Sequence, residues 1–100
     1  MAKQGRGQLT ERVQERAKQL MGREITMREL RLMAYVQYVM VNEQMIERSK
    51  INEEEVGILE KWREENHIEW GAAANIAVSK EFWDTICQLV WLAYVDLSAE

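Results

Sequence analysis

The segment from Phe82 to Val95 is apolar over most of a helical circumference, which is more than one buried face requires. Its apolar residues form two neighbouring stripes, Phe82, Ile86, Leu89 and Ala93 in one and Trp83 and Trp91 in the other. The two tryptophans are eight residues apart and therefore lie within about 80° of each other on a helix. One stripe can face a core. The other has to meet the first helix, a second copy or another protein, because soluble chains seldom leave so large an apolar patch in water.

Two helices are predicted ahead of the hairpin region from spacing and capping signals. Apolar residues recur at helical spacing from Leu9 to Met21 and are followed by Gly22, so residues 9–21 are expected to form the first helix. Thr26 and Glu29 form a capping box, which starts a second helix at residue 27 that should run to residue 45 or 46. Since residues 32–41 hold little polar surface, this helix is expected at the centre of the core.

The second half of the chain repeats the start signal. Asn52 and Glu55 form another capping box, and the glutamates at 53–55 suit the positive end of a third helix rather than a metal site. Helical periodicity is lost between 67 and 79, where residues 67–71 and 75–79 alternate in polarity and favour a short β-hairpin. Ser79 can then cap a fourth helix from Lys80 to about Val95.

The predicted fold is therefore mainly α: a small bundle of about four helices, with a short β-hairpin between the third and the fourth. Residues 1–8 are expected to form a mobile basic tail ahead of a single helical domain over 9–100. The longest apolar run, residues 89–95, is too short to span a bilayer. The polar N-terminus lacks the pattern of a secretory signal, and a single Cys87 fits a reducing compartment, so we expect a cytoplasmic protein.

No chemistry-bearing motif is evident. With one His67 and one Cys87, the chain cannot assemble a zinc set, and it has no dinucleotide fingerprint, phosphate loop or nucleophile elbow. We therefore expect no enzyme activity, no cofactor and no metal.

Charge is distributed unevenly along the chain. Residues 1–31 carry eight Lys or Arg against four Glu, a net +4, whereas residues 32–100 carry five against thirteen, a net −8. A basic arm can bind nucleic acid or an acidic protein, or it can be a solvated helix whose glutamates pair with its own basic residues; the interleaved glutamates favour the solvated helix.

Partner binding through aromatic anchors and a basic arm is the function that these features favour. The candidate residues are Trp70, Phe82, Trp83, Trp91 and Tyr94 as hydrophobic anchors and Arg6, Arg12, Arg16, Lys18 and Arg23 for electrostatic steering. Two alternatives stay open. One is a winged-helix-like DNA-binding regulator that uses the basic arm, although the third helix and the hairpin are acidic. The other is a self-assembling helical protein whose second copy covers the surplus stripe.

A family resemblance points to one class of partner. The stretches Glu53–Ile68, Lys80–Asp84 and Ala93–Asp96 resemble the small early proteins of temperate phages of enteric bacteria, in particular their anti-RecBCD proteins. The likeness covers roughly the last half of the chain. It implies a non-enzymatic phage protein that acts in the bacterial host cytoplasm. There it would bind the host RecBCD helicase-nuclease and inhibit or modify its processing of DNA ends, to the benefit of phage recombination. It assigns no role to individual residues.

Overall fold

The computed structural model describes residues 9–42, 46–70 and 76–95, with the side chains of Arg48 and Trp70 excepted. Over these ranges the chain forms four α-helices, one short 3-10 turn and a two-stranded antiparallel hairpin between α3 and α4. The predicted mainly α fold is confirmed. The expectations for residues 1–8 and for the turn at 71–75 fall outside the described residues.

Helix α1 (Glu11–Met21) begins two residues later than the periodicity indicated, because Thr10 caps it. The Thr10 hydroxyl accepts a hydrogen bond from the Val13 backbone N–H at 3.2 Å. Gly22 ends the helix in the left-handed region, at φ 78°, and its N–H donates to the Lys18 carbonyl at 3.0 Å. A residue with a Cβ is strained there, so glycine is suited to this position.

Helix α2 (Met27–Val41) starts where its capping signal predicted but ends earlier. The Thr26 hydroxyl accepts from the Glu29 N–H at 3.0 Å. At the other end, both the backbone and the side-chain N–H groups of Asn42 donate to the Tyr38 carbonyl, at 3.1 and 2.8 Å. Asn42 thus satisfies a terminal carbonyl and ends the helix, so the predicted extension to Ile46 is wrong. Ile46 is buried but not helical.

Helix α3 (Glu53–Glu64) has the predicted reciprocal capping box. The Asn52 side chain accepts from the Glu55 N–H, and the Glu55 carboxylate accepts from the Asn52 N–H, both at 2.9 Å. The short 3-10 turn η1 (Arg48–Lys50) just before it was not anticipated. After the helix, Asn66 adopts a positive φ of 66° and turns the chain into the hairpin.

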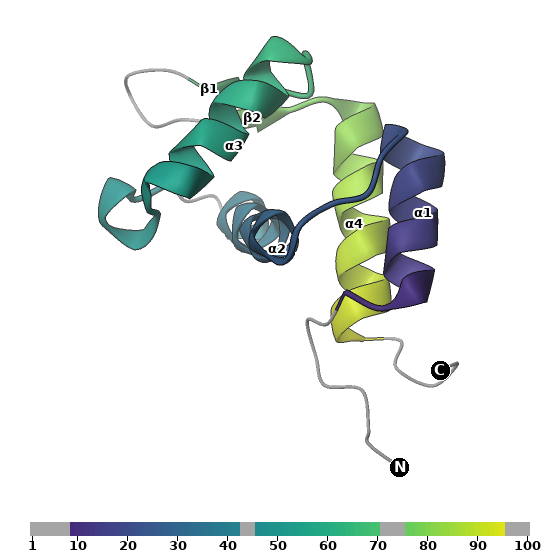
Figure 1. The fold of residues 1–100 in the computed structure, drawn as a ribbon. Helices are drawn as coiled ribbons and strands as arrows, with labels where there is room; N and C mark the ends of the chain where they lie inside the picture. Colours follow the sequence, from purple (N-terminus) through teal and green to yellow (C-terminus); the bar gives the residue numbers. More distant parts are fainter. Residues whose placement is uncertain (1–8, 43–45, 71–75, 96–100) are drawn as a thin grey trace.

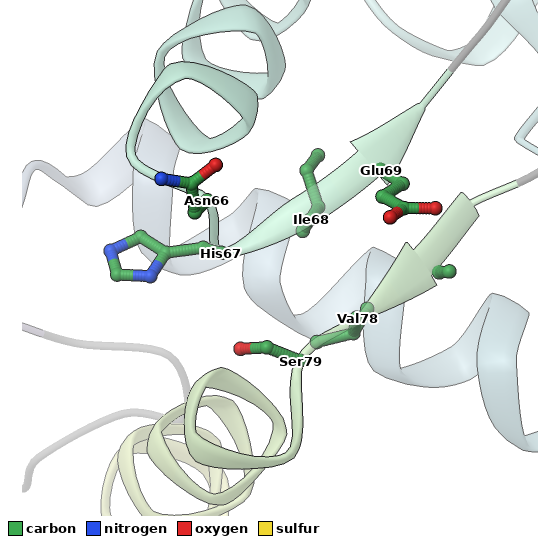
Figure 2. A pocket seen from close by; sticks show the side chains of 7 residues that line it. Asn66, His67, Ile68, Glu69, Val78 and Ser79 are labelled. Atoms are coloured by element: carbon green, nitrogen blue, oxygen red, sulfur yellow. The ribbon is translucent and has the colours of Figure 1, made fainter.

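The hairpin consists of β1 (Ile68–Trp70) and β2 (Ile76–Val78), in register with Ile68 opposite Val78 (Figure 2). Its strands are shorter than the two alternating runs in the sequence, but their placement confirms the prediction. Alternation puts Ile68 in the core and Glu69 in solvent. The hairpin returns the chain from the end of α3 to the start of α4.

Helix α4 (Lys80–Tyr94) is capped by Ser79, whose hydroxyl accepts from the Phe82 N–H at 3.1 Å. In Figure 1, α1 and α4 lie side by side, and α2 is seen nearly end-on between this pair and α3. The core therefore fills the space around α2. Helix α2 was predicted to be central, and its contacts with both α3 and α4 agree with that.

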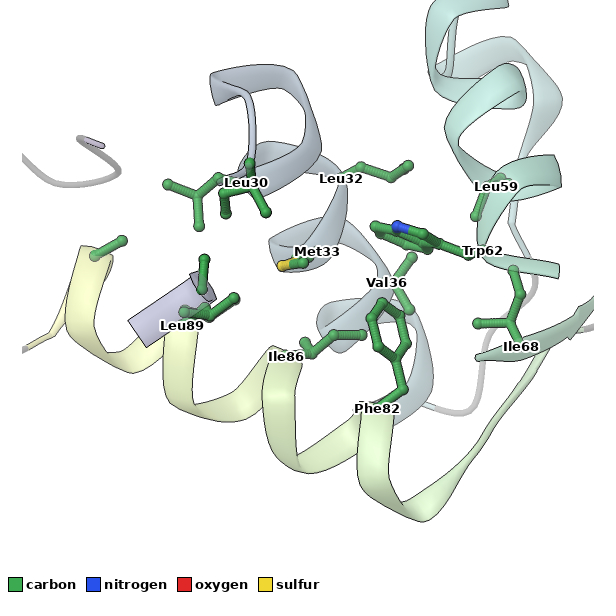
Figure 3. Packing of buried hydrophobic residues seen from close by; sticks show 14 of the residues in the cluster. Leu30, Leu32, Met33, Val36, Leu59, Trp62, Ile68, Phe82, Ile86 and Leu89 are labelled. Carbon is green, nitrogen blue, oxygen red and sulfur yellow. The ribbon is translucent and has the colours of Figure 1, made fainter. Parts of the chain in front are cut away.

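Aromatic packing joins the two sides of this core. The rings of Trp62 from α3 and Phe82 from α4 meet edge to face, with centroids 4.9 Å apart, next to Val36 of α2 (Figure 3). Met33 and Ile86 continue the contact between α2 and α4 (Figure 3). Burying a large aromatic or aliphatic side chain stabilises a fold by about 1.5–3 kcal/mol each, so this cluster holds the three helices together.

A charged group lies inside this apolar region. Glu29 is only 4% exposed, and its carboxylate pairs bidentately with the Arg23 guanidinium at 2.9 and 2.8 Å. It also accepts a hydrogen bond from the Trp62 indole N–H at 2.8 Å. Its side chain is thus engaged by groups from the α1–α2 connection and α3. The capping-box prediction had the Glu29 carboxylate accept a hydrogen bond from the Thr26 backbone N–H. In the structure the carboxylate binds Arg23 and Trp62 instead.

Burial is the largest influence on the Glu29 carboxyl, and alone it would raise the pKa. The hydrogen bonds from Arg23 and Trp62, with the charges of Arg23 and Lys61, together outweigh burial and lower the pKa of Glu29 below its ordinary value. The same hydrogen bond to Glu29 raises the pKa of Arg23. Both groups are therefore charged across the physiological range.

Candidate functional site

The two apolar stripes of α4 have different environments. Phe82, Ile86, Leu89 and Ala93 are all buried in the core. In the neighbouring stripe Trp91 is 51% exposed and Trp83 is half-buried. Helix α1 does not cover this stripe, because it meets α4 at the opposite edge, where Arg12, Arg16 and Leu92 line a shallow depression. The stripe with the tryptophans is therefore the one left for a partner.

The exposed stripe of α4 is linked to α2 by a hydrogen bond at Cys87. The side-chain amide of Gln37 on α2 donates to the Cys87 thiol on α4, with Nε2 and Sγ 3.6 Å apart. Val41 lies one helical turn beyond Gln37 on the same side of α2, and Tyr38 lies about 100° further around the helix. Tyr38 is 55% exposed and Val41 is 66% exposed.

We name the exposed and half-buried residues of these two linked helices the α2–α4 face. Its members are Tyr38 and Val41 from α2 and Trp83, Cys87, Trp91 and Tyr94 from α4. Aromatic side chains make up most of it, and Tyr and Trp are the residue types enriched at the energetic centres of protein interfaces. Tyr38 and Val41 were absent from the sequence-based candidates. The signal that pointed to them was the lack of polar residues around the α2 circumference.

Cations flank the α2–α4 face. Arg31 lies two helical turns before Tyr38 on the same side of α2, and Lys80 lies at the start of α4. Both side chains are exposed. Neither forms an ion pair with another residue in the described part of the chain. Asp84 is the acidic residue nearest Trp83 along α4 and is exposed as well. The face is thus apolar at its centre and mixed in charge, with a positive excess, at its rim.

Two of the sequence-based candidates have other roles in the structure. Phe82 is 2% exposed, and its ring packs on Trp62 and stacks on His67, so it belongs to the core and not to an exposed anchor set. Arg23 is committed to the buried Glu29 carboxylate. Phe82 is thus not an exposed anchor and Arg23 is already paired within the chain, while contact of either residue with a partner stays a prediction. Both residues make tertiary contacts with residues that are distant or unremarkable in the sequence, so local sequence patterns do not reveal these roles.

The remaining candidates are spread over the chain. Tyr94 is half-buried at the end of α4. On α1, Arg12 is half-buried, Arg16 is exposed, and Lys18 pairs with Glu24 at 3.3 Å. Arg6 and the Trp70 side chain lie outside the described residues. The basic residues of α1 are thus interleaved with acidic ones, as the sequence favoured.

The winged-helix alternative finds little support in the charges of its candidate elements. Helix α3 precedes the hairpin, as a recognition helix would, but it exposes Glu53, Glu54, Glu60 and Glu64. In the hairpin Glu69 is exposed too. Phosphate contacts need the opposite sign of charge, so these elements are poorly suited to DNA.

A shallow open pocket lies beside the hairpin, with a volume of about 220 Å³ (Figure 2). His67 at its edge stacks on Phe82 at 4.3 Å between ring centroids, and its Nε2 lies 3.4 Å from the Glu65 carboxylate. The Ser79 hydroxyl in the same pocket accepts the capping hydrogen bond of α4. These polar groups are explained by local structure and do not form a nucleophile with a general base.

Within the described ranges, no group of three or more His, Cys, Asp or Glu side chains is placed to hold a metal ion. None of the helices in these ranges has the length and apolar character that crossing a bilayer requires. Comparison with known proteins gave no matching family model, no matching curated protein and no matching solved structure. Function has to be inferred from the surface itself.

Proposed function

We propose that the chain is a non-enzymatic interaction protein that binds another protein through the α2–α4 face. The observation that carries this proposal is the exposure of three large side chains on two packed helices, Trp91 of α4 and Tyr38 and Val41 of α2. A tryptophan in solvent gains most by insertion into a partner pocket. Such a protein acts by occupying a surface of its target and needs no chemistry of its own.

The partner proposed from the sequence resemblance is the host RecBCD helicase-nuclease, with the chain encoded by a phage and acting in the bacterial cytoplasm. A standard interface buries about 800 Å² on each partner. The folded chain exposes 6525 Å², so such an interface would occupy about one eighth of its surface. Occupying a DNA-binding or regulatory surface of the enzyme would inhibit its nuclease activity or change it.

Binding to purified RecBCD tests this proposal. The wild-type chain is expected to co-elute with RecBCD in size-exclusion chromatography and to change the rate at which the enzyme degrades linear duplex DNA. Trp91→Ser should weaken binding by about 10-fold or more, because hot-spot truncations cost at least about 1.4–2 kcal/mol. Glu60→Ala, on the exposed side of α3, is the matched surface control and should bind like the wild type.

Two results would contradict the proposal in different ways. Failure of the wild-type chain to co-elute with RecBCD, with nuclease activity unchanged, excludes this partner. Equal binding by the wild-type and Trp91→Ser chains would show that the α2–α4 face is not the binding surface.

A further inference from the structure

The exposed stripe of α4 has a pattern that is symmetric about its midpoint. Trp83 and Trp91 lie four residues on either side of Cys87, and Lys80 and Tyr94 lie seven residues on either side. At 100° per residue, all five positions fall within about 80° of the helix circumference. They therefore form one straight strip along the outer side of α4.

A symmetric strip of this kind suits a particular partner, a second copy of the same strip running in the opposite direction. We propose that two copies of the chain associate through antiparallel α4 helices, around a two-fold axis that passes close to Cys87. Isologous contacts require a patch that complements itself after a half-turn. Here the half-turn sets Trp83 of one copy against Trp91 of the other, twice.

The charges at the ends of α4 fit the same arrangement. Seven residues from the axis, Lys80 of one copy meets Tyr94 of the other, in the last turn of its α4. That last turn contains no basic residue of its own, and its free carbonyls carry the negative end of the helix dipole. Lys80 has no ion-pair partner among the described residues and is free to supply the missing cation. Antiparallel α4 helices also place opposite dipole ends together.

This dimer does not rest on binding to RecBCD, since it concerns the chain alone. It does use the same tryptophans, so self-association and target binding exclude each other on one copy. A target would have to compete with the second copy for the α2–α4 face.

Sedimentation equilibrium of the purified chain tests the association. The wild type is expected to reach twice the 11.8 kDa chain mass as its concentration rises. Trp91→Glu should raise the dimer dissociation constant by about 30-fold or more, because at each of two equivalent contacts a tryptophan is lost and a charge is set against Trp83 of the other copy. Lys80→Glu should weaken the dimer several-fold at low salt. It should not destabilise α4 itself, because a glutamate is favourable in the first turn of a helix. Gln19→Glu, on the exposed side of α1, adds the same charge elsewhere and should leave the mass unchanged.

Crosslinking tests the geometry. Packed helices lie about 8–10 Å apart, so a two-fold axis at Cys87 brings the two thiols within reach of a short bismaleimide. Because Cys87 is the single cysteine, any linked dimer must join these two positions, and Cys87→Ser should abolish the product. A chain that stays monomeric overturns the proposal, and so does a dimer that resists crosslinking or tolerates Trp91→Glu. A monomer that still binds RecBCD overturns the dimer alone, whereas a crosslinked dimer without RecBCD binding overturns only the proposed target.

Discussion

Replacement of Glu29 by alanine is expected to lower the free energy of unfolding by about 3 kcal/mol, although the residue carries a charge and lies in the first turn of a helix. Its carboxylate is the shared acceptor for Arg23 and Trp62, at 2.8–2.9 Å. Removing the carboxylate therefore disturbs the contact between α2, α3 and the α1–α2 connection at once.

The magnitude follows from what each partner loses. The Trp62 side chain is fully buried, and its indole N–H would have no acceptor, which costs about 1–3 kcal/mol. The Arg23 side chain is 30% exposed and can turn to water, so its loss is closer to the value of a surface pair, about 1 kcal/mol. A 100-residue domain has about 5–15 kcal/mol of stability in total, so the variant should fold but be clearly weakened.

Urea denaturation followed by far-ultraviolet circular dichroism measures this difference, and the melting temperature should fall by at least about 12 °C. The matched control is Glu24→Ala, which removes a carboxylate paired at 3.3 Å with Lys18, where both side chains are exposed. That change should cost no more than about 0.5 kcal/mol. A difference of less than about 1 kcal/mol between the two variants would show that the Glu29 network does not stabilise the fold.

Three further outcomes are expected. Because the pKa of Glu29 is lowered in the folded chain, its stabilising effect is complete above its ordinary value of 4.5 and is lost as the pH falls through the lower folded value. The stability difference between wild type and Glu29→Gln should thus be constant from about pH 6 to 8 and shrink in acid, as urea titrations at each pH would show. Gly22→Ala should cost about 1 kcal/mol in thermal denaturation through its positive φ alone, since a Cβ there would meet no atom within 4 Å. Phe82→Ala should cost about 3–5 kcal/mol and Trp91→Ser less than about 1 kcal/mol in the same assay; equal costs would mean that Trp91 is a core residue.

Helix starts were predictable from the sequence because capping is a local interaction. Thr26, Asn52 and Ser79 each bond an N–H group three residues away, and each marks the helix start that was expected. The end of α2 was not predictable in the same way. Three polar residues follow Val41, but Met45 and Ile46 then resume the helical spacing of apolar residues, so the pattern alone does not mark the end at Asn42.

Glu29 shows where local rules fail. Three residues after Thr26, it has the spacing of a capping box, and nothing nearby in the sequence indicates another partner. Trp62 is 33 residues away, and only the packing of α3 on α2 brings its indole N–H to the carboxylate. Two charge-assisted bonds and an indole donor in a buried site outweigh one exposed backbone N–H.

The sequence predicted that α4 would leave apolar surface exposed, but it did not predict which side of the helix this would be. The sequence showed two apolar stripes on α4 and one too many for a single core, yet either stripe fits that statement. The choice was made by α1, which packs along the Leu92 edge of α4, and by α2, which reaches α4 through Gln37 and Cys87. Those contacts enclose the Phe82 stripe and leave Trp91 half-exposed. Because the exposed face is created by how three helices meet, its α2 members carry no signal in their own segment that separates them from core residues.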